Sequence, residues 1–194
     1  LASNLSVLAR PPYDPNRDLQ MIAHLGVQPN LLGVAPAFQA KTVQELLDMA
    51  RASPGKLMFG SSGNGTSMHL TAELLKLMTG TQMVHVPYKA AQQVIADIIG
   101  GQVNFMFDNM GSIIGHVRGG RVKALGVAAK NRLAALPDLP TLDESGAPGV
   151  ETGISHGVLT LSAVPKPIVA TLNRAINTAI SDAEYKTTIT DRKS

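Results

Sequence analysis

The chain has no cysteine and no tryptophan among its 194 residues, and its aromatic residues amount to only 4%. The lack of cysteine excludes disulfides, thiolate metal sites and cysteine nucleophiles, and it is compatible with an oxidising compartment. Few aromatic rings argue against the stacking platforms that bind single-stranded nucleic acid. No apolar run reaches the ~18 residues that a transmembrane helix requires. What remains for function is chemistry based on backbone groups, hydroxyls, imidazoles and single charges.

Charge is sparse as well. Charged residues make up 16% of the chain and the net charge is +3, with Lys and Arg scattered singly. Tails that bind nucleic acid carry runs of basic residues, so we expect no nucleic-acid partner. Hydrophobic residues reach 44%, enough to build a folded core. A weakly positive surface favours the capture of small anions.

The most informative segment is residues 56–70, KLMFGSSGNGTSMHL. A short apolar strand at 57–59 leads into a small-residue loop, and a helix follows. Backbone N–H groups and the positive end of the helix dipole converge at such a junction, and glycines allow close approach of a ligand. The sequence therefore predicts a carboxylate-binding loop made of Ser61, Ser62, Gly63, Gly65, Thr66 and Ser67.

Two nucleotide-binding patterns are nearly present in this loop and fail. Gly60 and Gly65 have the spacing of a P-loop, but Thr66 stands where the lysine is needed. The glycines also fall as G-x-x-G-x-G, which is not the dinucleotide pattern, so we expect no cofactor. No two histidines have the i, i+4 spacing of a helical metal site, so no metal is expected. A tight strand-to-helix connection that binds nothing fits the same residues.

Strands and helices alternate from residue 31 to residue 128, which predicts an α/β fold with mostly parallel sheets flanked by helices. Thr42-x-x-Glu45 is a capping box that begins a helix over 43–52. In parallel sheets ligands bind at the carboxyl ends of the strands, where three segments would meet: 61–67, 87–89 and 108–111. A further helix at 165–181 is predicted to bury its apolar face: Ile168, Val169, Leu172, Ile176 and Ile180.

Other candidate residues flank the loop. Tyr88 and Lys89 follow a strand and either face the ligand or form an ordinary surface. Asp108 ends an apolar strand, where it either binds an amino or hydroxyl group of the ligand or caps the helix that begins near Ser112. His69 lies just inside the helix and is expected to orient the loop or to touch the ligand. Three other histidines are interpreted as structural: His24, His116 and His156.

Several ordered strings carry a family resemblance. They are Y-D-P at 13–15, P-G-K at 54–56, G-S-S-G at 60–63, H-V-P-Y-K at 85–89, G-G-Q-V at 100–103 and L-P-D-x-P-T at 136–141. In this order they resemble the tripartite tricarboxylate transporter receptors, also called Bug-type periplasmic solute-binding proteins. Two departures are Ala90, where the family usually has glycine, and Ser155-His156-Gly157, where it usually has W-x-G.

The resemblance implies a two-lobed, flytrap-like receptor of the type II periplasmic-binding-protein class, which clamps a small carboxylate between α/β lobes. It implies that residues 1–32 belong to the first lobe, 33–152 form the second lobe, and 153–194 return to the first lobe. The chain appears truncated at both ends, since the first third of a typical receptor and its final helices have no counterpart. Ser3 would reach the ligand from the first lobe.

The resemblance also implies function and location. The ligand would be a di- or tricarboxylate, an amino acid or an aromatic acid, delivered to the membrane permease subunits of the transporter. We expect a periplasmic monomer, exported with a signal peptide that is not in this chain, and no enzymatic activity. Two rivals stay open: a degenerate receptor fragment serving as a signalling or protein-interaction module, and a serine-type hydrolase. A nucleophile elbow places G-x-S-x-G at a sharp strand-to-helix turn, and the string of this form at 153–157 runs into a predicted strand instead, which argues against the hydrolase.

Overall fold

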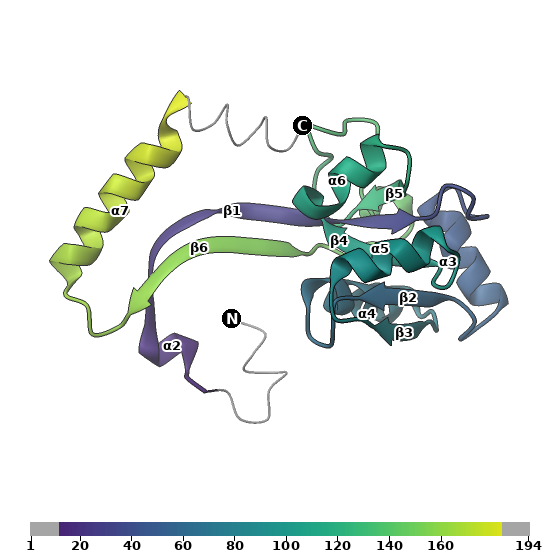
Figure 1. Ribbon diagram of the computed structural model, residues 1–194, viewed down its shortest axis with the longest axis horizontal. Coiled ribbons are helices and arrows are strands. Elements are labelled where there is room, and N and C mark those ends of the chain that lie inside the picture. The colour runs from purple at the N-terminus through teal and green to yellow at the C-terminus, as the bar shows by residue number, and fades with distance from the viewer. Residues whose placement is uncertain (1–11, 184–194) are drawn as a thin grey trace. The chain divides into compact units, whose positions relative to one another are not determined.

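A computed structural model describes residues 12–183 of the chain. The chain divides into two compact units (Figure 1). The second unit is Gln28–Ile154, and the first unit holds the residues before and after it. Each unit is described below by itself.

The second unit is built on one sheet with the strand order β3 (Val84–Pro87), β2 (Met58–Ser61), β4 (Phe105–Asn109), β1 (Leu19–Val34) and β5 (Lys123–Val127). Strand β2 runs parallel to β3 and β4, whereas β1 runs antiparallel to β4 and β5. The predicted α/β class is confirmed, with a mixed sheet. The crossovers through helices fix β2, β3 and β4 as parallel. Strand β1, whose first residues belong to the other unit, is free of that constraint.

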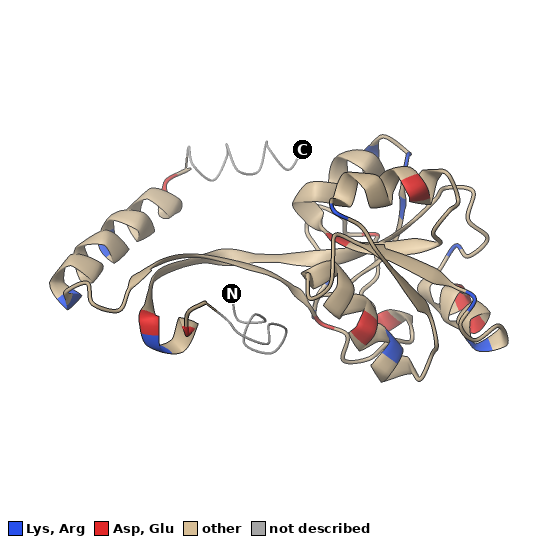
Figure 2. Ribbon diagram, turned by 60° about the horizontal axis from the view of Figure 1, so that its bottom comes forward, with Lys and Arg blue, Asp and Glu red and all other residues tan. Residues whose placement is uncertain are grey.

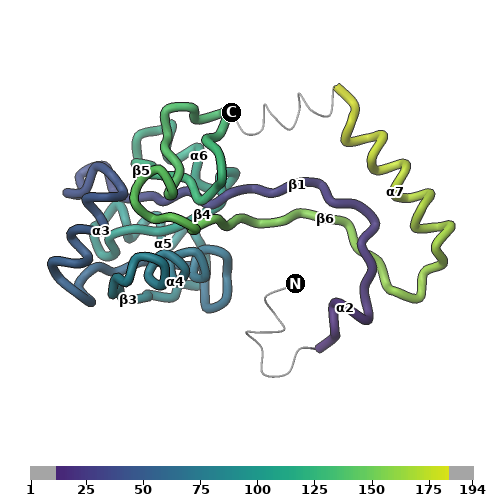
Figure 3. The backbone as a smooth tube through the Cα atoms, turned by 180° about the vertical axis from the view of Figure 1, so that it is seen from behind, coloured from purple at the N-terminus to yellow at the C-terminus, as the bar shows by residue number. Residues whose placement is uncertain are grey.

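Helices cover both faces of this sheet: α3 (Val43–Ala52), α4 (Ser67–Thr79), α5 (Ala91–Ile99) and α6 (Met110–Arg118). Successive strand residues point to opposite faces, so Phe105 and Phe107 pack with α3 and α4, while Met106 packs with α5 and α6. Gly60 lets α5 approach closely, since a Cβ there would lie 2.3 Å from Val94 Cγ1. The layers can be followed in Figures 1 and 3, which view the protein from opposite sides.

Capping residues set the boundaries of three helices. Thr42 Oγ1 accepts the Glu45 N–H at 3.2 Å and begins α3. The short 3-10 helix η1 (Asp143–Ser145) has a full capping box, because Thr141 N–H donates to Glu144 at 2.8 Å and Glu144 N–H donates to Thr141 at 3.1 Å. Helix α4 ends at Gly80, in the left-handed conformation with φ 64°.

The first unit contains α2 (Pro15–Asp18), the first part of β1, β6 (Gly153–Leu161) and α7 (Lys166–Ser181). Strand β6 pairs with β1. Gln20 Nε2 lies within hydrogen-bonding distance of three carbonyls at the end of β6 and just beyond it, those of Leu161, Ser162 and Val164. Asn173 Nδ2 donates to the Ile22 carbonyl at 2.6 Å and ties α7 to β1.

The predicted burial of the α7 apolar face is wrong for the described part of the chain. No residue of α7 is buried, and Ile168 and Leu172 are 51% and 41% exposed. Within residues 12–183 the first unit offers two strands and a short helix, which is too little surface to enclose a helix.

Charged residues of both signs are interspersed over the chain, as Figure 2 shows. The ion pair between Arg132 and Glu144 at 2.9 Å is typical, with both side chains nearly half exposed. Such surface pairs contribute little to stability. None of the helices within residues 12–183 has the length and apolar composition needed to cross a membrane.

Candidate functional site

The predicted site residues of the second unit gather at one edge of the sheet. Strands β2, β3 and β4 are parallel and end at Ser61, Pro87 and Asn109. The Tyr88 N–H donates to the Ser61 carbonyl at 2.8 Å, which joins the ends of β3 and β2. The segments 61–67, 87–89 and 108–111 therefore lie along one edge, as parallel strands require.

The loop between β2 and α4 has a fixed shape. Gly63 and Gly65 have positive φ angles of 121° and 76°, which residues with a Cβ adopt only with strain. Thr66 is the N-cap of α4, since its Oγ1 accepts the His69 N–H at 3.4 Å and donates to the Gly63 carbonyl at 2.8 Å. The hydroxyl of Thr66 thus holds both the loop and the helix start.

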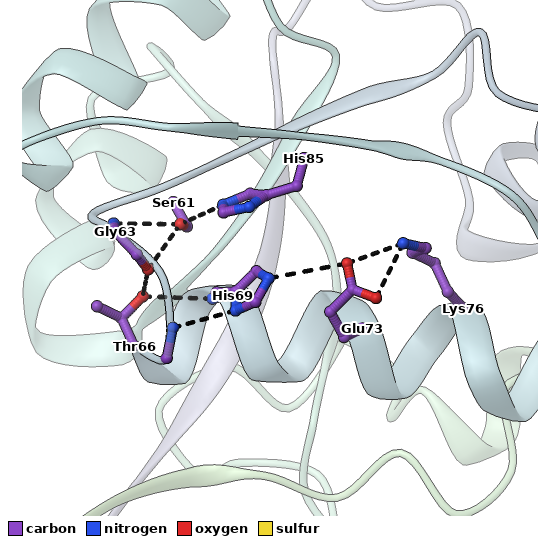
Figure 4. Close-up of polar contacts among 8 residues, drawn as sticks. Ser61, Gly63, Thr66, His69, Glu73, Lys76 and His85 are labelled. Atoms are coloured by element: carbon purple, nitrogen blue, oxygen red, sulfur yellow. Dashed lines mark hydrogen bonds and ion pairs between the residues drawn. The ribbon is translucent and has the colours of Figure 1, made fainter. Parts of the chain in front are cut away.

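Ser61 supports this loop from beneath. Its side chain is fully buried, and its Oγ lies 3.2 Å from the Gly63 nitrogen, 3.1 Å from the Gly63 carbonyl oxygen and 2.6 Å from His85 Nε2. These contacts are drawn in Figure 4. A hydroxyl has one proton, so Ser61 accepts from the Gly63 N–H and donates either to the Gly63 carbonyl or to His85. The Ser61 side chain therefore stabilises the loop from inside the protein.

The remaining loop residues differ in what they offer. The Gly65 N–H donates to His69 Nδ1 at 3.1 Å, and the Ser62 hydroxyl lies 3.1 Å from Met68 Sδ. Ser67 begins α4, and the N–H groups of Ser67 and Met68 fall in the first turn, where an α-helix supplies no carbonyl for them. These backbone donors are the groups best placed to bind an anion.

A stack of rings lies behind the loop and includes His85, which sequence reasoning did not single out as a site residue. The His69 and His85 ring centroids are 4.2 Å apart, and those of His85 and Phe59 are 4.9 Å apart. Burial lowers the pKa of His85, and the nearby His69 lowers it further. The signal that could have found His85 is strand pairing, since it lies opposite Phe59 in the parallel register of β2 and β3.

Tyr88 and Lys89 follow β3. The Tyr88 hydroxyl donates to Asp97 Oδ2 of α5 at 2.7 Å, and burial together with this bond raises the pKa of Tyr88 to about 12. Lys89 is exposed, and its backbone N–H donates to Gln93 Oε1 at 3.2 Å. Tyr88 is therefore a neutral phenol tied to α5 at neutral pH, while Lys89 presents its ammonium at the surface.

Asp108 is buried at the end of β4, with 2% of its surface exposed. Its carboxylate accepts from the Asn109 backbone and side chain at 2.8 and 3.1 Å and from the Ser112 hydroxyl at 2.6 Å. Burial raises the pKa of Asp108, and the hydrogen bonds from Ser112 and Asn109 oppose that rise. The N-cap of α6 is Asn109, whose Oδ1 accepts the Ser112 N–H at 3.1 Å.

A buried polar network that the sequence did not reveal supports the first turn of α4. Asn30 of β1 is fully buried, and its Nδ2 donates to Thr71 Oγ1 at 2.7 Å. Thr71 Oγ1 lies 2.7 Å from Thr152 Oγ1 and donates to the Ser67 carbonyl at 2.7 Å. In the sequence the only hint of this network is Asn30, a polar residue directly before the apolar run of β1.

One predicted ligand residue, Ser3, lies outside the described residues. Within residues 12–183 no three His, Asp or Glu side chains gather in a way that could hold a metal ion.

Solved structures of periplasmic binding proteins share the helix-flanked sheet of this chain. The structure described as "R. palustris Rpa4515 with adipate" has a TM-score of 0.87 and 30% identity, covering 96% of this chain and 62% of that chain. MatC from Rhodopseudomonas palustris with bound malate has a TM-score of 0.84 and 28% identity, covering 98% of this chain and 65% of that chain. The fold is therefore that of a periplasmic solute-binding protein.

The family follows from the sequence match. The model of the tripartite tricarboxylate transporter family receptor matches residues 6–193, and the chain belongs to that family. Protein BugT of Bordetella pertussis is 30% identical over 180 residues, which are 93% of this chain and 55% of that protein. The resemblance to Bug-type receptors is thus confirmed. The chain spans about half the length of the curated relatives it matches.

Proposed function

We propose that this chain is the ligand-binding part of a periplasmic receptor that captures a small organic carboxylate for a tripartite tricarboxylate-type transporter. The observation that carries the proposal is the loop from Ser61 to Ser67, whose shape is fixed and which ends on the start of α4. The adipate and malate recorded with two related structures support the ligand class.

Within the loop the residues divide into two roles. Ser61, Thr66 and the Gly65 N–H bond to other parts of the protein and hold the loop in shape. The backbone of Ser62 and the first-turn N–H groups at Ser67 would then meet the carboxylate. Hydrogen bonds to a charged group are each worth about 1.5–3 kcal/mol, so a few of them give useful affinity without a buried cation. The helix dipole adds to this attraction.

We also propose that the second unit is the second lobe of the receptor and that the first unit belongs to the first lobe. A ligand held by both lobes stabilises only the closed arrangement, so binding would shift the population toward closure. Delivery to membrane permease subunits would then depend on the closed form.

The proposal is tested by a thermal-shift screen of the chain against malate, adipate, succinate, citrate, aspartate, glutamate, nicotinate and benzoate. We expect a saturable rise in melting temperature with one ligand class, because a ligand that binds only the folded state stabilises it. Cooperative unfolding without a shift for any of these ligands would contradict carboxylate capture by this chain.

The exposed apolar face of α7 favours one second candidate, a protein-interaction module. Ile168 and Leu172 remain exposed in the described structure, and apolar patches of this kind mark interaction surfaces. Sedimentation at several concentrations distinguishes the candidates. The sedimentation coefficient rises with concentration if the chain self-associates through α7, and it stays constant for a receptor monomer. A serine hydrolase is disfavoured because Ser61 is fully buried; an ester-turnover assay with Ser62→Ala as the variant tests it.

A further inference from the structure

His69 occupies an unusual position relative to the loop. The Gly65 N–H donates to its Nδ1 at 3.1 Å, so this nitrogen is an acceptor and carries no proton. The ring proton of the neutral imidazole is then on Nε2, which faces Glu73 Oε1 at 3.8 Å. Figure 4 shows the ring between the loop and Glu73. The hydrogen bond that holds Gly65 therefore exists only while His69 is uncharged.

Gly65 is a sensitive point of the cradle. Its φ of 76° turns the chain immediately before the N-cap Thr66, so the Gly65 peptide sets the direction in which the loop enters α4. A proton on Nδ1 would place one N–H donor against another, and the Gly65 N–H would lose its partner. Imidazole is the side chain that gains this proton between about pH 5 and 8.

We propose that His69 is a proton-sensitive positioning residue, whose neutral ring holds Gly65 in the ligand-binding shape and whose protonation releases Gly65 and weakens carboxylate capture. This inference rests on the proposed function for its effect on affinity. Its effect on the loop does not depend on any ligand.

The charged and titratable groups around His69 favour this outcome. Glu73 and Lys76 come from the same helix, and Lys76 pairs with Glu73 at 2.8 and 2.9 Å. His85 comes from β3 with its ring centroid 4.2 Å away, and β2 contributes the uncharged Phe59. A cation on His69 would lie beside the Glu73 carboxylate, which reduces its attraction for an anionic ligand. The lost Gly65 bond is the effect that the proposal assigns to protonation.

His85 makes a useful contrast because its role differs from that of His69. Its Nε2 contacts Ser61 Oγ at 2.6 Å, and a charged His85 would still donate to that hydroxyl. Burial and the adjacent His69 lower the pKa of His85, and protonation of His85 would break no hydrogen bond to the loop. The switch is therefore assigned to His69 alone.

The experiment is a titration of the ¹⁵N-labelled, ligand-free chain by NMR from about pH 8 to about pH 5. We expect the Gly65 amide resonance to shift with the same midpoint as the His69 ring. In His69→Asn the amide oxygen takes the place of Nδ1 and does not titrate, so the Gly65 resonance should stay constant. His24→Asn, which changes an exposed histidine of the first unit, is the matched control and should titrate like the wild type. A Gly65 resonance that ignores the His69 titration overturns the inference.

Affinity for malate and adipate is measured over the same range. We expect wild-type affinity to fall about tenfold toward acid pH, as for the loss of one part-buried hydrogen bond, while His69→Asn stays level. Equal pH profiles in both proteins, after the Gly65 resonance has responded, would overturn the functional half of the inference. Binding by neither protein at any pH would count against the proposed function, and the Gly65 resonance still decides whether His69 controls the loop.

Discussion

Strands β2 and β4 lie side by side in the same direction, and each leads into a helix at the same edge of the sheet. Strand β4 passes directly into α6, and the chain places its own carboxylate, Asp108, beside that helix start. Strand β2 reaches α4 only after a glycine-rich loop, and residues 57–72 contain no Asp or Glu. The start of α6 thus has an acidic side chain of its own beside it, whereas no acidic residue directly precedes or begins α4. We propose that this absence leaves the start of α4 open to an anionic ligand.

The strongest way to break this contrast is to give α4 its own acid. We expect Ser67→Glu to weaken carboxylate binding at least ~hundredfold, because like charges brought together at a binding site cost several kcal/mol. The folded state should lose nothing, since an acidic side chain in the first turn of a helix is worth about 0.3–1 kcal/mol. Isothermal titration calorimetry and thermal unfolding measure the two effects.

The matched control for Ser67→Glu is Gln44→Glu. Gln44 is an exposed residue in the first turn of α3. This helix follows the end of β1 that pairs with the start of β4. This variant makes the same change in charge at the opposite edge of the sheet and should bind as the wild type does. An equal loss of affinity in both variants would show that net charge, and not the α4 start, governs binding.

The loop itself gives the second prediction. Gly65→Ala should weaken carboxylate binding about tenfold, because a left-handed residue with a Cβ costs roughly 1–2 kcal/mol and the loop relaxes to avoid it. Gly80→Ala imposes the same kind of strain at the other end of α4, where φ is 64° and a Cβ would meet nothing within 4 Å. Both variants should lose similar stability in thermal unfolding. Only Gly65→Ala should lose affinity, and loss of affinity in neither would remove the loop from the site.

Much of this fold was predictable because its signals are local. The range 43–52 follows from Thr42 and the breaker residues after it, and the end of α4 follows from Gly80. The direction of β1 was not predictable, since hydrophobic periodicity does not record whether a strand is parallel. The exposure of α7 depends on which surfaces meet it, and its amphipathic pattern alone says nothing of that.

The site shows the same division. Glycines, hydroxyls and a helix start within residues 60–67 identify the cradle from a single window of sequence. The support of Ser61 by His85 crosses 24 positions and exists only through the pairing of β2 with β3. Asn30 and Thr152 meet Thr71 across still longer separations. Local motifs therefore predict which residues would meet a ligand, while the residues that hold them in place emerge only from the register of the sheet.

The smallest expected effect concerns the junction between β4 and α6, where Asp108 lies. Burial raises the pKa of Asp108, so its ionised form costs stability in the folded state that its protonated form does not. Stability from this group is complete below the pKa of the unfolded chain and is lost as the pH rises through the folded pKa. Acidification from neutral pH should therefore favour the wild type over Asp108→Asn in thermal unfolding. At neutral pH we expect the free energy of unfolding of Asp108→Asn to be about 1 kcal/mol lower than that of the wild type, because the amide keeps one acceptor oxygen and loses the other.

The same variant decides between the two roles that the sequence leaves open for Asp108. Its carboxylate accepts three hydrogen bonds from Asn109 and Ser112, so the change should appear in stability and in its pH dependence. A stability difference that does not vary with pH would show that Asp108 is not ionised against burial at this junction. A loss of malate affinity in a folded Asp108→Asn protein would place the carboxylate against the ligand. The two helix starts would then share one binding site, and the contrast between them would lie in the loop alone.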